Sequence, residues 1–199
     1  MQSETFRSLV KPTETVMRVL WLAFLAMVPI YVCIAYLTFG RDAPGVMPRS
    51  NPLTIPLAVL SLVAAALAPY APRLLLSDSR LRELLDRQPD PETLARDRRT
   101  SKVDKDRLAR IKTLSPDEQR LLALVPSFFA GFIVRLAFNE SIALYGLVLA
   151  FISRFFVALL PFAVVSLALN LMVSPALDSE LQRVAGLLLQ PDDVATQPR

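Results

Sequence analysis

The 199-residue sequence contains no histidine and a single cysteine. These shortages exclude histidine-based acid–base catalysis, zinc sites built from cysteine and histidine, and internal disulfides. Charged residues make up only 20% of the chain and apolar residues 53%. Such a composition excludes a disordered chain, because enough apolar surface is present to be buried. What remains to be explained is where the apolar residues lie.

The apolar residues lie in long runs. Three runs without a charge, of 21, 22 and 23 residues, cover positions 19–39, 51–72 and 155–177. A bilayer core about 30 Å thick requires about 20 apolar residues per helix. A fourth apolar stretch, 121–153, contains three strongly polar residues, Arg135, Asn139 and Glu140. We therefore predict an all-α integral membrane bundle of four transmembrane helices, with spans at about 17–39, 52–74, 125–152 and 155–175.

The stretch 121–153 allows two interpretations. As one helix it extends for about 50 Å, and a span of about 127–151 places Glu140 near the middle of the membrane. The alternative is a hairpin that turns at Asn139 and Glu140, but it leaves only 141–153, which is too short to cross. We favour one long helix. Its start is marked by a capping box, with Ser115 as N-cap, Pro116 at the first position and Glu118 three residues after the cap.

The basic residues predict the orientation. The segment 73–120 holds 13 Lys and Arg with 10 Asp and Glu. Together with both termini it places 18 basic residues on one side of the predicted spans and three on the other. The positive-inside rule then places both termini and the loop 77–120 in the cytoplasm. We expect one multi-pass domain over 1–199 in a bacterial inner membrane, with a charged helical loop at 77–120 and a cytoplasmic tail at 178–199.

The loop itself shows helical patterns. Ser79 to Arg87 carries leucines at helical spacing, and Asp90 with Pro91 opens a second helix. We expect that helix to continue through the charged segment 95–112, with a thin apolar edge formed by Val103, Leu108, Ile111 and Leu114. Two interpretations stay open, solvated helices on the membrane surface or a platform for protein docking. Acidic residues interleave with the basic ones and no aromatics accompany them, so we expect no nucleic acid binding.

The chemistry of the chain concentrates in the stretch 121–153. Ionisable groups inside a bilayer are costly, so Arg135, Asn139 and Glu140 form a predicted intramembrane polar site. Glu140 lies about 140° around the helix from Arg135, so the two are not natural partners. A stripe of mostly small residues allows a neighbouring helix to approach closely, with a small-xxx-small pair at its centre. The stripe contains Arg135, Asn139, Ala143, Gly146, Ala150 and Ser153.

The eleven residues from Glu140 to Ala150, ESIALYGLVLA, resemble the ion-carrying helix of rotary ATPase proteolipid (c-type) subunits. In that family a mid-membrane carboxylate precedes a Tyr-Gly-Leu run. The resemblance implies Glu140 as an ion carrier, with Tyr145 and Gly146 as its packing neighbours. The same string also resembles a helix of uncharacterised bacterial four-span membrane proteins.

No nucleophile with a base, Gly-rich phosphate loop or metal-ligand set occurs in the sequence. We therefore expect no catalytic residues, no cofactor and no metal. The leading hypothesis is a non-catalytic inner-membrane protein, an accessory or assembly component or a small subunit of a membrane complex. Besides the lipid bilayer, we expect a protein partner or a homo-oligomer through helix 125–152 and loop 77–120. The alternative is a proton- or ion-translocating component that uses Glu140.

Overall fold

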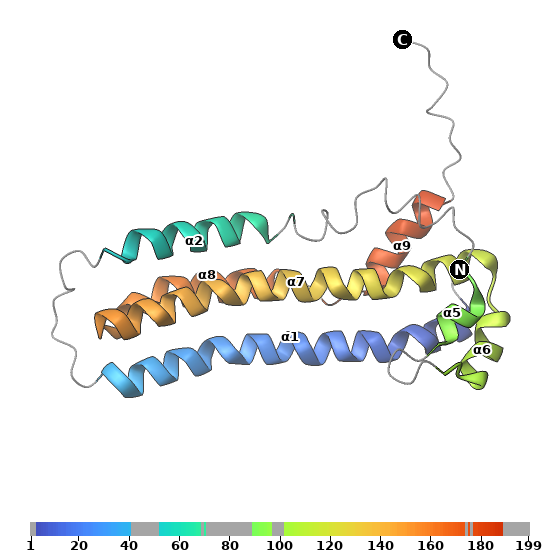
Figure 1. The fold of residues 1–199 in the computed structure, drawn as a ribbon, viewed down its shortest axis with the longest axis horizontal. Helices are drawn as coiled ribbons and strands as arrows, with labels where there is room; N and C mark the ends of the chain where they lie inside the picture. The colour runs from blue at the N-terminus through green and yellow to red at the C-terminus, as the bar shows by residue number, and fades with distance from the viewer. Residues whose placement is uncertain are drawn as a thin grey trace, which may run out of the picture. The chain divides into compact units, whose positions relative to one another are not determined.

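The computed structural model describes residues 3–40, 52–68, 70, 89–96, 102–173, 175 and 177–188. Within these residues every regular element is a helix, which confirms the all-α prediction (Figure 1). One isolated bridge pairs Arg96 with Val103. The helices are α1 (Glu4–Phe39), α2 (Thr54–Leu67), α5 (Pro91–Ala95), α6 (Lys105–Lys112), α7 (Pro116–Ser153), the 3₁₀ helix η1 (Phe156–Leu159), α8 (Leu160–Leu171) and α9 (Leu177–Leu188).

Two helices, α1 and α7, are long and apolar enough to cross a membrane. They contain 36 and 38 residues, and shorter apolar helices cover Thr54–Leu67 and Phe156–Leu171. Helix α7 continues without a break through Asn139 and Glu140, so the prediction of one long helix is confirmed and the hairpin is wrong. The predicted span 52–74 extends past α2 into residues outside the described part.

The chain divides into two compact units, and α1 and α7 each contribute to both. Unit 1 consists of Met1–Thr15, Leu76–Phe129 and Ala176–Arg199, and unit 2 of Val16–Leu75 and Ala130–Pro175. Unit 1 therefore holds α5, α6 and α9, whereas unit 2 holds α2, η1 and α8. The predicted charged loop 77–120 falls in unit 1, and the predicted apolar spans fall in unit 2 except for the first five residues of the span 125–152.

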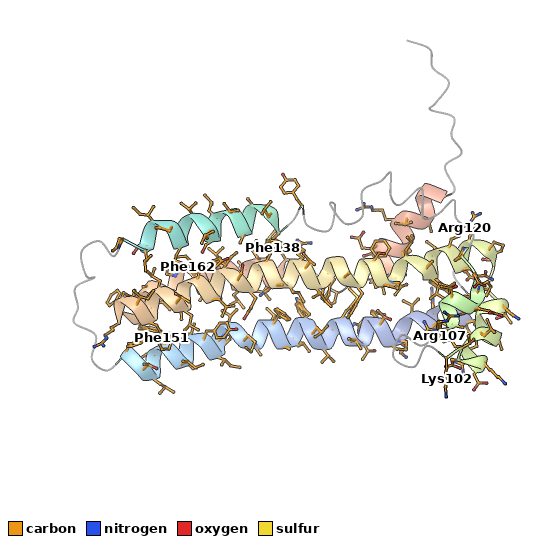
Figure 2. The ribbon with its side chains drawn as sticks, viewed as in Figure 1. Lys102, Arg107, Arg120, Phe138, Phe151 and Phe162 are labelled. Carbon is orange, nitrogen blue, oxygen red and sulfur yellow. The ribbon has the colours of Figure 1, made fainter. Side chains whose placement is uncertain are left out.

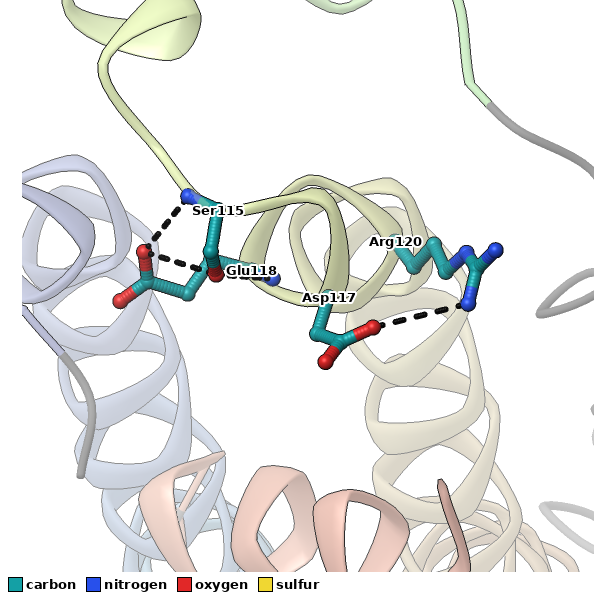
Figure 3. Close-up of polar contacts among 4 residues, drawn as sticks. All are labelled: Ser115, Asp117, Glu118 and Arg120. Atoms are coloured by element: carbon teal, nitrogen blue, oxygen red, sulfur yellow. Dashed lines mark hydrogen bonds and ion pairs between the residues drawn. The ribbon is translucent and has the colours of Figure 1, made fainter. Parts of the chain in front are cut away.

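In unit 1, one carboxylate caps two helices. The capping box forms as predicted, because Glu118 Oε2 accepts from the Ser115 amide at 3.1 Å and Ser115 Oγ accepts from the Glu118 amide at 3.3 Å (Figure 3). Glu118 Oε1 also accepts from the backbone amide of Ser3 at 2.6 Å. Ser3 in turn caps α1, since its hydroxyl accepts from the Phe6 amide.

The loop helices differ in part from prediction. Asp90 caps α5, and hydrogen bonds from the Thr93 hydroxyl and the Glu92 amide hold the pKa of this carboxyl below its usual value. The expected continuous helix over 95–112 is wrong. Helix α5 ends at Ala95, and Asp104 begins the new helix α6 by accepting from the amides of Asp106 and Arg107. The helix predicted over 79–87 lies outside the described residues.

The apolar edge predicted for this segment does pack inward. Ile111 and Leu114 are buried, and Val103 and Leu108 are half-buried. The Gln119 amide fastens the turn between α6 and α7 by donating to the carbonyls of Ile111 and Leu114, each at 3.2 Å.

In unit 2 the segments of α1 and α7 lie side by side, and α8 and α2 also lie beside α7 (Figure 1). Phe39 of α1 and Phe151 of α7 make an edge-to-face pair with centroids 5.1 Å apart. Helices α7 and α8 approach closely at Gly146, where an added Cβ would lie 2.5 Å from the Cβ of Phe162. The core shared by α1, α7, η1 and α8 contains mostly small residues, namely Val28, Ala35, Ala143, Ala150, Leu159 and Ala163.

Arg154 forms the turn between α7 and η1. Its φ of 52° is the only positive value recorded for a non-glycine residue in the described part of the chain. This left-handed conformation reverses the chain immediately after Ser153, so that α8 returns along α7.

Candidate functional site

The surface of unit 2 is rich in large exposed apolar side chains, unlike the surface of a water-soluble protein. Helix α2 buries Ser61 and Ala64, and its C-cap residue Ala68 is also buried, whereas Ile55 is 74% exposed and Leu62 is 71% exposed. Residues spaced by seven, such as Ser61 and Ala68, share one face, so the small residues form the inner face of α2. Large apolar side chains cover the outside (Figure 2).

Helices α8 and α1 repeat this pattern. Helix α8 buries Ala163, Ser166 and Asn170, while Val164 is 65% exposed and Leu171 is also exposed. In the apolar window of α1 only 11% of the residues are buried. A core helix of a soluble protein would be buried instead, so the outer faces of unit 2 match an apolar surrounding medium.

Polar side chains are buried where α7 meets α8. The Asn139 amide donates to the side-chain oxygen of Asn170 at 3.1 Å, and the two residues are 1% and 0% exposed. The indole of Trp21 on α1 donates to the backbone carbonyl of Asn170 at 2.9 Å. Ser166, one turn before Asn170 on α8, is also fully buried. Three helices therefore converge on this cluster.

Glu140 faces a different neighbour. It is 7% exposed, and Tyr31 of α1 is the side chain that interacts with its carboxyl. Among the described residues, however, neither carboxyl oxygen meets hydrogen-bond geometry. Because successive residues of a helix point about 100° apart, Asn139 can face α8 while Glu140 faces α1. The carboxyl is thus enclosed and incompletely bonded.

The other predicted site residues do not join Glu140. Arg135 is half-buried and makes no hydrogen bond or ion pair within the described part of the chain. Tyr145 lines an open, mostly apolar groove of about 340 Å³ between α2 and α7, together with residues such as Ala137 and Ser141. The site predicted from α7 alone is therefore divided among three faces of that helix.

The predicted small-residue stripe is occupied within the chain. Ala143 and Ala150 belong to the core cluster, and Gly146 contacts Phe162 and Leu159 of the following hairpin. Close packing of the stripe is thus intramolecular. Any partner of α7 must use its remaining exposed face, which carries Ala130, Ala137, Leu144, Val148 and Phe151.

Sequence reasoning missed the partners of the polar residues. Ser166 and Asn170 lie four residues apart in the run 155–177, so a one-faced polar pair was visible there. Trp21 and Tyr31 carried no local signal, because an amphipathic aromatic fits any span. In the described residues, no group of three or more acidic or cysteine side chains is placed to hold a metal ion.

Comparison of the chain with protein-family models, curated proteins and solved structures gave no match.

Proposed function

We propose that the chain is an integral inner-membrane protein of four spans that serves as a non-catalytic accessory or assembly component, or small subunit, of a membrane complex. The observation that supports membrane insertion is the apolar outer surface of unit 2, where large side chains such as Ile55, Leu62 and Val164 are exposed. In water this surface would aggregate, whereas in lipid it costs nothing.

Charged substitutions on the outer faces test insertion. Lys at Leu62 or at Val164 would meet hydrocarbon in a membrane, at a cost of about 3 kcal/mol near the middle of a span. We expect both variants to lose stable integration, measured as alkali-resistant protein in the membrane fraction. Gln182→Lys, at an exposed position of α9, is the control and should change nothing. Unaltered integration together with higher solubility of the Leu62 and Val164 variants would reject the proposal.

The depth of the polar residues follows from the proposed insertion. If Arg154 marks one boundary, Glu140 lies about 21 Å along α7 from it and Arg135 about 28 Å. In a core about 30 Å thick, Arg135 then lies at the opposite boundary, where its guanidinium can reach headgroups and water. Trp21 lies near the same level on α1, as an interfacial aromatic would. The positive-inside rule supports placing this boundary, both termini and the loop on the cytoplasmic side.

A partner role rests on two exposed features. In unit 1 an open cleft of about 410 Å³ between the start of α1 and α6 contains two acids and two arginines, Asp104, Asp106, Arg107 and Arg110. In unit 2 the free face of α7 carries Ala137 beside the apolar groove. A protein partner or a second copy would be recognised by charge at the first place and by close helix packing at the second.

Site-specific photocrosslinking tests these surfaces. A benzophenone side chain at Ala137 or at Arg107 should give a discrete adduct in membranes, with one partner or with a second copy. Arg110→Asp should abolish the Arg107 adduct but not the Ala137 adduct. The control position is Ala143, which is fully buried and should give no intermolecular product. Adducts with lipid alone at both surfaces would reject the partner role.

A second function is supported by one observation, the enclosed carboxyl of Glu140 beside Tyr31. A proton- or ion-translocating component requires a carboxyl that can change charge inside the membrane. In vesicles containing the purified protein, Glu140→Gln would then stop proton flux, whereas Glu118→Gln in unit 1 would leave it unchanged. Equal flux with and without the Glu140 carboxyl would exclude this function and leave the accessory role.

A further inference from the structure

The junction of α7 and α8 contains more hydrogen-bonding capacity than the protein satisfies. Asn139 uses its amide nitrogen toward Asn170, but its Oδ1 has no partner among the described residues, and neither has the Nδ2 of Asn170. Ser166 Oγ is in the same state. All three side chains are at least nine-tenths buried. An unsatisfied acceptor and an unsatisfied donor therefore belong to one pair of contacting amides.

The arrangement matches the hydrogen-bonding pattern of water. A water molecule donates two hydrogen bonds and accepts two, and buried waters typically bind two to four polar groups that the protein leaves unsatisfied. One molecule can donate to the Asn139 oxygen and accept from the Asn170 amide, which closes the ring that the two amides leave open. Ser166 is one helical turn away along α8 and extends the polar face inward.

The polar cluster lies near the C-terminal end of α8. Helix α8 ends at Leu171, immediately after Asn170, and the next residue, Met172, is highly exposed. On α7, the half-buried Arg135 lies one turn before Asn139 and about 40° around the helix, so it borders the same seam. The seam between α7 and α8 is closed by Gly146 and Phe162 at one end. At its other end α8 stops, and there Met172 is exposed whereas Val173 is buried.

We infer that the α7–α8 seam is an internal hydration site, in which water binds Asn139, Asn170 and Ser166. Glu140 is not part of it, because that carboxyl interacts with Tyr31 on α1. The inference rests on contacts within unit 2 and holds whichever of the two functions is correct. Water would then be the hydrogen-bond partner of three buried polar atoms that have none among the described residues.

Asparagine labelling makes the test direct, because the chain contains only Asn51, Asn139 and Asn170. In protein labelled with ¹⁵N-asparagine and held in detergent micelles, the side-chain amides give few signals, which Asn139→Leu and Asn170→Leu assign. We expect both buried amides to show NMR cross-peaks at the water frequency. Amides that show only aliphatic cross-peaks and stay protected from D₂O for hours would overturn the inference.

Ser166→Ala supplies a matched probe of the same seam. It places a methyl group at a position that is fully buried, as are the methyl groups of Ala143 and Ala150 in the apolar core. We expect a water cross-peak at the new methyl and none at the other two. Cross-peaks at all three methyl groups would mean that water penetrates the whole bundle in detergent. Cross-peaks at none would mean that the seam contains no water. Either result overturns the inference.

Discussion

The Asn139 side chain of α7 donates a hydrogen bond over 3.1 Å to the Asn170 side chain of α8, a residue 31 positions later in the chain. Both residues are almost fully buried. In a bundle whose other contacts involve small apolar residues, this bond fixes the register of α7 against α8. A slip of one residue would turn each amide about 100° away from the other.

Removing both members of this pair should cost less than the sum of the two single removals. Asn139→Leu leaves the Asn170 amide buried with fewer partners, at a cost of about 1–2 kcal/mol. The double variant with Leu at both positions removes both amides, so neither is left with an unsatisfied partner, and we expect a coupling energy of about 1 kcal/mol between the sites. Denaturation in mixed micelles of the four proteins in this cycle measures it. Strict additivity would mean that the bond contributes nothing.

Gly146 should tolerate no side chain. Even the methyl group of Gly146→Ala would lie 2.5 Å from the Cβ of Phe162, an atom fixed to the backbone, so α8 must move. Overpacking of this kind typically costs about 1–3 kcal/mol. The matched control is Gly186→Ala on α9, where an added Cβ meets no atom within 4 Å. That variant should gain up to about 1 kcal/mol in helix stability, because alanine replaces glycine. Thermal unfolding in detergent separates the two signs.

The helices of this fold were largely predictable, because they follow from hydrophobic run length. The start of α7 was predictable to the residue, since Ser115, Pro116 and Glu118 act locally. The end of α5 was not. The charged segment after it has good helix formers, but Asp104 competes for the backbone amides of the next turn and begins a new helix instead.

The polar site was predicted only in part, for a geometric reason. Helical periodicity separated Arg135 from Glu140 on α7, and the structure keeps them apart. Helical periodicity carries no information on which neighbouring helix each face of α7 contacts. Asn170 and Tyr31 lie on two other helices, and their pairing with Asn139 and Glu140 depends on how α8 and α1 pack against α7.

Unit 1 should loosen in acid through Glu118. Partial burial raises the pKa of this carboxyl, but hydrogen bonds from Ser3 and Ser115 outweigh burial and hold the pKa below its usual value of 4.5. A lowered pKa means that the stabilisation is complete at neutral pH and is lost as pH falls through the lowered value. Hydrogen exchange of the first turn of α1, corrected for the intrinsic effect of pH, should therefore report opening below about pH 4.5.

Two variants separate this effect from general acid denaturation. Glu118→Gln should open the first turn of α1 at neutral pH and weaken the further response to acid. Asp117→Asn removes only a surface ion pair with Arg120 at 3.5 Å, and such pairs contribute little. An identical pH response in the Glu118 variant and the unaltered protein would show that the double cap is not the sensor.

The turn after α7 should be improved by glycine. Arg154 has a φ of 52°, and the left-handed region costs a residue with a Cβ about 1 kcal/mol. Arg154→Gly removes that cost, so we expect the hairpin formed by α7, η1 and α8 to gain about 1 kcal/mol against denaturation in micelles, less the extra chain entropy of glycine. Ser153→Gly, one residue earlier, should have the opposite sign, because Ser153 is helical and its hydroxyl donates to the Leu149 carbonyl at 2.7 Å. Loss of stability in both variants would mean that the Arg154 side chain, which the proposed insertion places at a membrane boundary, contributes more than its backbone strain costs.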